Sequence, residues 1–145
     1  KVTPQIKALI KAGIPVMGHL GLTPQSIHTL GGYRVQGRGK NGAQIIADAI
    51  ALQEAGVFAL VLELVPAELA AEITAALEIP TIGIGAGKDC DAQVLVWSDL
   101  MGLTAKPPKL AKAYRNLREE MSNAVKEWSA DVASGAFPDE GQTFH

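Results

Sequence analysis

The stretch GVFALVLELVPAELAAEITAALEIPTIGIGAG, residues 56–87, decides the fold. Residues 57–65 form an apolar run without polar alternation, interrupted only by Glu63, which is typical of a strand covered on both faces. Pro66 then opens an amphipathic helical segment at a favoured first-turn position. A further apolar strand follows over residues 79–84 and runs into glycines. The order strand, helix, strand predicts a parallel sheet with right-handed crossovers.

The segments before this stretch repeat the same unit of helix, glycine and apolar strand. Amphipathic helices are expected over residues 4–12, with Thr3 as N-cap, and over residues 41–55. An apolar strand over residues 14–20 leads into a long glycine-rich loop, residues 21–42. We therefore expect an α/β architecture in which loops at the carboxyl ends of the strands form one face.

After residue 87 the pattern changes in two steps. A fourth apolar run is expected over residues 94–97, which makes about four strands in all. A proline-containing linker over residues 104–109 then leads to a more charged helix, expected from Leu110 to about Ser134. Trp97 and Trp128 are expected to be packing residues.

The composition excludes several classes of protein. The chain has 145 residues, of which 48% are hydrophobic and 19% charged, so it can build a core and is not disordered throughout. A net charge of −2 without long blocks of like charge argues against nucleic-acid and anionic-membrane partners. No apolar run approaches the roughly 18 residues of a membrane span. Cys90 is the single cysteine and cannot form an internal disulfide, so we expect a cytoplasmic location.

Glu63 is the most informative candidate for chemistry. A carboxyl group inside an apolar strand costs several kcal/mol to bury in its charged form unless it is paired. Glu63 lies near the carboxyl end of its strand, where α/β enzymes place catalytic groups, and it suits a general base. The alternative is a structural glutamate that pairs with an arginine or caps a helix. His19 ends the preceding strand and should point to the same mouth, although a lone histidine is more often structural.

Three other groups of residues are candidate ligand sites. The run GIGAG, residues 83–87, lacks the full dinucleotide fingerprint and fits either close approach of a ligand or a tight turn. Asp89, Cys90 and Asp91 suggest a metal, but a Mg²⁺ site usually needs carboxylates from separate strands. The loop cations Arg34, Arg38 and Lys40 suit an acidic ligand less well than they suit a solvated loop.

Four strings resemble the ketopantoate hydroxymethyltransferase family: PVMGHLGLTPQSIHTLGGYRVQGR (residues 15–38), LVLELVPAELA (60–70), IPTIGIGAG (79–87) and SGAFPDEGQTFH (134–145). The resemblance covers essentially the whole chain, but only the carboxyl-terminal part of the family. It implies the carboxyl-terminal part of a (βα)₈ TIM barrel over residues 1–108 and a helical extension with a tail over residues 109–145. It also implies a homo-oligomer, a decamer of two pentameric rings.

The resemblance further implies a reaction. The family transfers a hydroxymethyl group from 5,10-methylenetetrahydrofolate to 3-methyl-2-oxobutanoate, giving 2-dehydropantoate for pantothenate and coenzyme A biosynthesis. The oxo acid chelates Mg²⁺, which stabilises the enolate. The family's base falls on Glu63, and His19 and Gly85 are expected to bind substrate or line the active site. The metal ligands belong to earlier strands, so none is expected in this chain.

Two other interpretations stay open. One is another Mg²⁺-dependent TIM-barrel enzyme of 2-oxo acids and enolates, such as a relative of phosphoenolpyruvate mutase or isocitrate lyase, although the string GHLGLTPQ fits these poorly. The other is an inactive barrel fragment that needs its N-terminal half. Half a barrel exposes unpaired sheet edges and an open core. We therefore expect these residues to be one piece of a longer polypeptide, with the N-terminal half as its partner.

Overall fold

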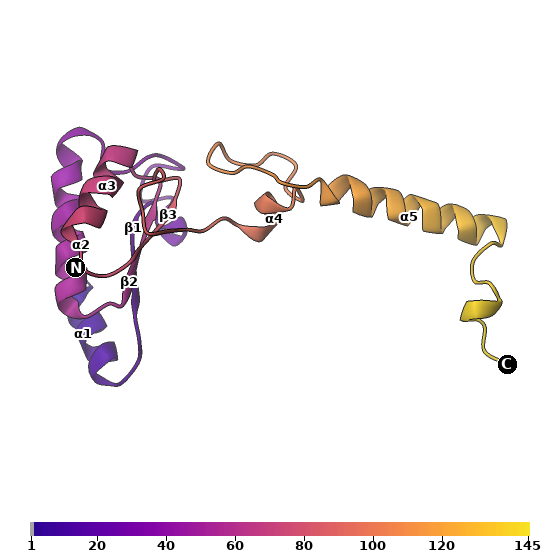
Figure 1. Ribbon diagram of the computed structural model, residues 1–145, viewed down its shortest axis with the longest axis horizontal. Helices are drawn as coiled ribbons and strands as arrows, with labels where there is room; N and C mark the ends of the chain where they lie inside the picture. The colour runs from indigo at the N-terminus through magenta and orange to yellow at the C-terminus, as the bar shows by residue number, and fades with distance from the viewer. Residues whose placement is uncertain (1) are drawn as a thin grey trace. The chain divides into compact units, whose positions relative to one another are not determined.

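The computed structural model describes residues 2–145 and divides into two compact units, the first ending at Val94 and the second beginning at Leu95. The first unit is α/β and confirms the predicted fold class (Figure 1). Its elements are α1 (Thr3–Lys11), β1 (Met17–Gly21), η1 (Pro24–Ser26), η2 (Gly39–Asn41), α2 (Gly42–Ala55), β2 (Ala59–Glu63), α3 (Ala67–Ala76), β3 (Thr81–Ile84) and β4 (Ala92–Gln93). The predicted domain division at residue 108 stays a prediction.

The four strands form one all-parallel sheet in the order β1-β2-β3-β4. Consecutive strands are neighbours, so each connection advances the sheet by one position, as in a segment of a βα barrel. The register pairs Gly21 with Glu63 and Glu63 with Ile84, which brings the carboxyl ends of three strands to one edge.

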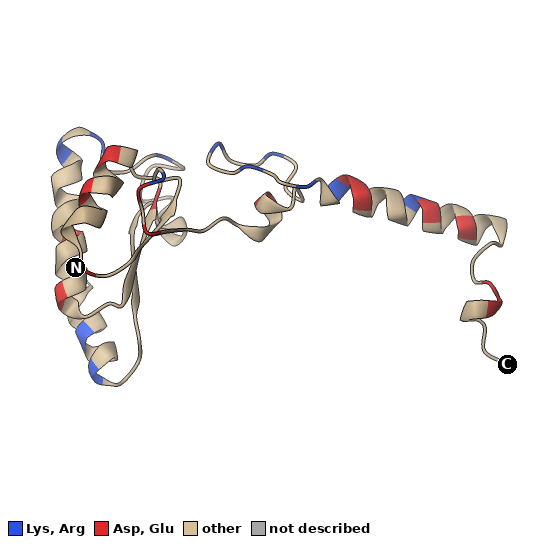
Figure 2. Ribbon diagram, in the orientation of Figure 1, with Lys and Arg blue, Asp and Glu red and all other residues tan. Residues whose placement is uncertain are grey.

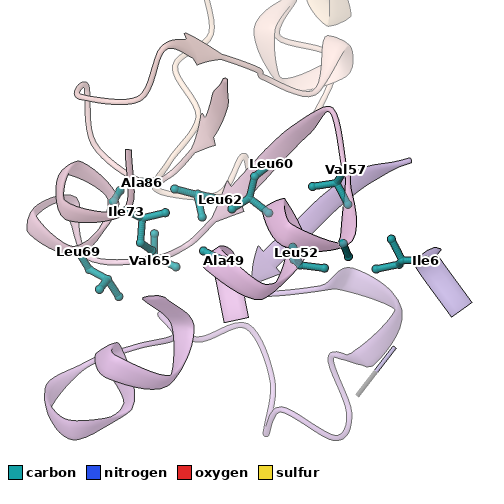
Figure 3. Packing of buried hydrophobic residues seen from close by; sticks show 12 residues of the cluster. Ile6, Ala49, Leu52, Val57, Leu60, Leu62, Val65, Leu69, Ile73 and Ala86 are labelled. Atoms are coloured by element: carbon teal, nitrogen blue, oxygen red, sulfur yellow. The ribbon is translucent and has the colours of Figure 1, made fainter. Parts of the chain in front are cut away.

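The core of the first unit lies between the sheet and the three helices, which cover one face of the sheet (Figure 1). Leu60, Leu62 and Ile73 are fully buried there and pack with nine other residues of the cluster (Figure 3). Side chains alternate along a strand, so Val61 and Glu63 point to the opposite face of β2 from Leu60 and Leu62. The candidate base is thus on the face that α1, α2 and α3 leave open.

The ends of the helices follow the sequence only in part. Gly13 and Gly56 have positive φ angles and end α1 and α2, as their positions predict. The predicted N-cap role of Thr3 is wrong, because Thr3 is the first helical residue and Val2 takes the N-cap position without a side-chain cap.

The fourth strand lies two residues earlier than the apolar pattern predicts. β4 is Ala92–Gln93, whereas residues 94–96 of the expected run belong to neither a strand nor a helix, and Trp97 begins α4 (Trp97–Leu100). Two contacts hold residues 91–94 beside β3: the Asp91 carboxylate accepts from the main-chain N–H of Thr81 at 2.8 Å, and the N–H of Val94 donates to the carbonyl of Gly83 at 3.0 Å. Pairing with β3 therefore reaches only the first residue of the predicted run.

The second unit holds α4, α5 (Leu117–Ser134) and η3 (Glu140–Gln142). The predicted helix from Leu110 begins at Leu117 instead, since the N–H groups of Tyr114 and Leu117 donate to the carbonyls of Leu100 and Met101 at 2.8 and 3.0 Å. Acidic and basic side chains are interspersed along α5 (Figure 2). No helix among residues 2–145 combines the length and apolarity that a membrane crossing requires.

The two tryptophans correct another expectation. Trp97 at the start of α4 is 64% exposed, and Trp128 on α5 is 55% exposed. Neither side chain is therefore a core packing residue in the described part of the chain.

Candidate active site

The structure brings together His19 of β1 and Glu63 of β2. His19 pairs with Val61 in the sheet register, two positions before the pair formed by Gly21 and Glu63. Both side chains therefore stand on the same face of neighbouring strands. The Nε2 atom of His19 lies 3.2 Å from Oε2 of Glu63, and the side chains are 32% and 10% exposed. The roles expected for His19 and Glu63 in the reaction stay predictions, whereas the contact between the two side chains is observed.

The contact between the two side chains is not a hydrogen bond. Nε2 of His19 is buried and has no hydrogen-bond partner within residues 2–145, because its orientation toward the carboxylate lies outside hydrogen-bond geometry. Glu63 forms an ion-pair contact with no arginine in the described chain, so the structural alternative of an arginine-paired glutamate finds no support. Both side chains can still form hydrogen bonds to a third polar group.

Main-chain hydrogen bonds hold the end of β2 from both sides. The N–H of Leu22 donates to the carbonyl of Glu63 at 2.8 Å, and the N–H of Leu64 donates to the carbonyl of Ile84 at 3.0 Å. The long loop also reaches this point, because the N–H of Gln36 donates to the carbonyl of Leu64 at 2.8 Å. The candidate base is therefore fixed to β1, to β3 and to the loop.

Leu64 has a backbone conformation that side chains disfavour. Its φ angle is +48°, and it is the single non-glycine residue with positive φ in the described chain. For a residue with a Cβ atom this region costs about 1–2 kcal/mol. The sequence carries no signal for it, because residues in this conformation are usually glycine or asparagine. The strain adjoins the candidate base directly.

Gly21 shows that the chains pack closely at the same point. Its φ angle is +89°, and a Cβ atom built there would lie 2.0 Å from the carbonyl oxygen of Glu63. Only glycine allows β1 to end so close to the main chain of β2.

Gly85 follows β3 at the same edge of the sheet. It is exposed, has a φ angle of +63°, and comes directly after Ile84, the register partner of Glu63. The neighbouring glycines serve packing instead: a Cβ atom at Gly83 would lie 3.0 Å from Sγ of Cys90, and one at Gly87 would lie 2.6 Å from Cβ of Ala67. The predicted role of Gly85 in the active site stays a prediction.

The two aspartates of the metal hypothesis lie elsewhere. The Asp91 carboxylate accepts hydrogen bonds from the N–H and the hydroxyl of Thr81, the first residue of β3, at 2.8 and 3.0 Å. These bonds, the main-chain one first, lower the pKa of Asp91 below its usual range. Asp89 contacts only the exposed Lys88, at 4.0 Å. No cluster of three metal-ligating side chains occurs among residues 2–145.

The loop cations Arg34, Arg38 and Lys40 are all exposed. No ion pair to an acidic side chain is formed by these three residues in the described chain. The solvated-loop interpretation therefore suits them.

The chain matches a known family and relatives twice its length. It matches the family described as ketopantoate hydroxymethyltransferase over residues 1–140, which confirms the resemblance. Relatives named 3-methyl-2-oxobutanoate hydroxymethyltransferase from Acidothermus cellulolyticus, Streptomyces avermitilis and Moorella thermoacetica are 61%, 59% and 59% identical to it. The matches cover 99%, 97% and 99% of this chain and 54%, 50% and 54% of the relatives. The chain thus spans about half the length of the curated relatives it matches.

Proposed function

Because the chain belongs to the ketopantoate hydroxymethyltransferase family, we propose that it supplies the base-carrying half of an enzyme that hydroxymethylates 3-methyl-2-oxobutanoate. The proposed one-carbon donor is 5,10-methylenetetrahydrofolate and the product is 2-dehydropantoate. The observation that carries this proposal is the nearly buried Glu63 carboxylate at the carboxyl end of β2, in contact with His19 at 3.2 Å.

In the proposed reaction Glu63 is the general base. The hydrogen on the carbon beside the keto group is a weak acid, and its removal needs a base held in place and shielded from water. The Glu63 carboxylate is 10% exposed and fits this requirement. The proton passes to a carboxylate oxygen, and the electron pair of the broken C–H bond forms the enolate. The enolate carbon bonds to the one-carbon unit, whose bonds to the folate nitrogens break; one water supplies the hydroxyl oxygen, and tetrahydrofolate leaves. His19 is proposed to bind substrate or line the active site, which its Nε2 atom, without a hydrogen-bond partner in the described chain, supports.

Mg²⁺ is proposed to be bound outside this chain. Asp91 is engaged by Thr81, and no three-ligand cluster occurs among residues 2–145. We assign the metal ligands to the segment that precedes these residues in the longer relatives. No role in metal binding is given to Glu63, His19 or the aspartates.

The same preceding segment is the proposed structural partner. β1 is an edge strand, with β2 as its single neighbour in the described sheet. An apolar cavity of about 320 Å³ runs beside it between α1 and α2, lined by Ile6, Val16, Met17 and Leu52 among others. Burial of such side chains and of a strand edge by another strand is the arrangement of a closed barrel.

We also propose a homo-oligomer, with the decamer as its size, in the cytoplasm. Met121, Val125, Trp128 and Val132 recur at spacings of three and four residues on α5, and all are exposed. Such a stripe on one face of a helix suits burial against another subunit. The unpaired thiol of Cys90 suits a reducing compartment. Neither nucleic acid nor a membrane is proposed as a partner.

The test uses the full-length protein and compares Glu63→Gln with Glu54→Gln. Glu54 is an exposed glutamate of α2 and serves as the matched control. Formation of 2-dehydropantoate from oxo acid, folate donor and Mg²⁺ should fall by about 10²–10⁴-fold in E63Q and stay unchanged in E54Q. Turnover of E63Q at the wild-type rate would exclude Glu63 as the base. Product formed at full rate by residues 1–145 alone would contradict the two-half proposal.

A further inference from the structure

We propose that Leu64 is a positioning residue for Glu63, because its left-handed backbone determines where the carboxylate stands. Leu64 follows Glu63 directly and has a φ angle of +48°. The inference rests on the proposed role of Glu63 as the base and goes beyond it by naming the residue that sets its geometry.

Two main-chain hydrogen bonds hold the strained residue Leu64 in its conformation. Its N–H donates to Ile84 at 3.0 Å, and its carbonyl accepts from Gln36 at 2.8 Å. Strained backbone persists where the surroundings over-determine it, and it collects at functional sites. Here the two hydrogen bonds come from β3 and from the glycine-rich loop, so the conformation is imposed by segments distant in sequence.

Main-chain hydrogen bonds also hold Glu63, the residue before Leu64. The carbonyl of Glu63 accepts from the N–H of Leu22 at 2.8 Å, and it lies so close to Gly21 that a Cβ atom built there would be 2.0 Å from it. The peptide group between Glu63 and Leu64 is thus held by β1 through its carbonyl and by β3 through its N–H, and Glu63 is in register with both strands. The Cα–Cβ direction of Glu63 is fixed by this arrangement. A different φ at Leu64 would break the bond to Gln36 or, where that bond is kept, rotate the end of β2 and move the Glu63 carboxylate away from His19.

A purely structural role is the competing explanation. Leu64 also lies in the short connection between β2 and α3, where the chain must reverse within a few residues. Loss of that turn would lower stability, and activity would fall only because less protein is folded. The two explanations differ in whether kcat and the melting temperature change together.

The experiment compares three variants of Leu64 in the full-length protein. Leu64→Met keeps the volume, Leu64→Asn favours the left-handed region, and Leu64→Val disfavours it because β-branched side chains clash there. Ile73→Val is the control: it removes one methylene from a fully buried residue of α3 and lowers the melting temperature through the core, leaving the backbone at Leu64 unchanged in sequence.

We expect kcat of L64V to fall about ten- to a hundred-fold with KM within about threefold of wild type. L64M and L64N should keep kcat near the wild-type value, and I73V should keep it despite its lower melting temperature. If L64V does not fold, Gln36→Pro, which removes the N–H donor to Leu64, should give the same loss of kcat.

Several results would overturn the inference. These are wild-type kcat in L64V, an equal loss in L64V and I73V, or a loss in L64N as large as in L64V. Failure of the proposed function looks different, because E63Q would then keep its turnover whatever the Leu64 variants do. An inactive E63Q beside a fully active L64V would remove the positioning role alone.

Discussion

Replacement of Thr81 by valine should destabilise the chain, although the two side chains have nearly the same shape. Thr81 is fully buried at the start of β3. Its hydroxyl lies 2.8 Å from the Thr74 hydroxyl and 3.0 Å from the Asp91 carboxylate, and it accepts from the N–H of Asp91 at 3.2 Å. Valine would remove all three contacts, and the Asp91 carboxylate would keep only the main-chain N–H of residue 81. The loss in the free energy of unfolding should be about 1–3 kcal/mol, the cost of orphaned polar groups.

The measurement is urea denaturation followed by far-ultraviolet circular dichroism at neutral pH. Thr29→Val is the matched control, since the exposed Thr29 hydroxyl donates to the carbonyl of Ser26 at 2.8 Å and water can replace it. T29V should change the free energy of unfolding by less than about 0.5 kcal/mol. If T81V is as stable as T29V, the Thr81 hydroxyl adds nothing to the stability of the chain, and the reasoning from its three polar contacts is wrong.

Two further predictions concern the same unit. The hydrogen bonds from Thr81 lower the pKa of Asp91, so the charged carboxylate stabilises the fold above its unfolded pKa, near 4, and this contribution is lost as pH falls through the folded pKa. The difference in the free energy of unfolding between wild type and Asp91→Asn, measured by urea titration, should therefore be largest at neutral pH and shrink in acid. A difference that grew in acid would contradict this prediction. Leu60→Ala should lower the free energy of unfolding by about 2–5 kcal/mol because Leu60 is fully buried, whereas Leu9→Ala, at a side chain 43% exposed, should cost far less in the same assay.

The sequence predicts those parts of the fold that depend on local pattern. β2, α3 and β3 lie where the apolar runs and Pro66 place them, and Gly56 ends α2 as expected. The predicted position of the fourth strand is wrong because β4 follows a hydrogen bond between Thr81 and Asp91, ten residues apart, and not the apolarity of residues 94–97. Long-range hydrogen bonds leave no periodic trace in a sequence, so pattern analysis misses them.

The candidate site divides along the same line. Glu63 is found because a carboxyl group in an apolar strand is anomalous, and His19 because parallel strands end at a common edge. The structure adds their 3.2 Å contact. Leu64 is not found, since leucine does not signal a positive φ angle, and Gln36 is not found because the loop folds back through main-chain bonds.

The energetic costs and the stabilising contacts lie at opposite ends of the sheet. At the amino end of β3, Thr81 and Asp91 satisfy each other's polar groups and add to stability. At the carboxyl ends of β1 and β2, Nε2 of His19 is buried without a hydrogen-bond partner in residues 2–145, and Leu64 is strained. The backbone conformation of Leu64 costs about 1–2 kcal/mol, and such strain collects at functional sites. Parallel α/β barrels place stability at the amino ends of their strands and chemistry at the carboxyl ends. The location of the unfavourable groups therefore favours the carboxyl end as the reacting end, independently of the family to which the chain belongs.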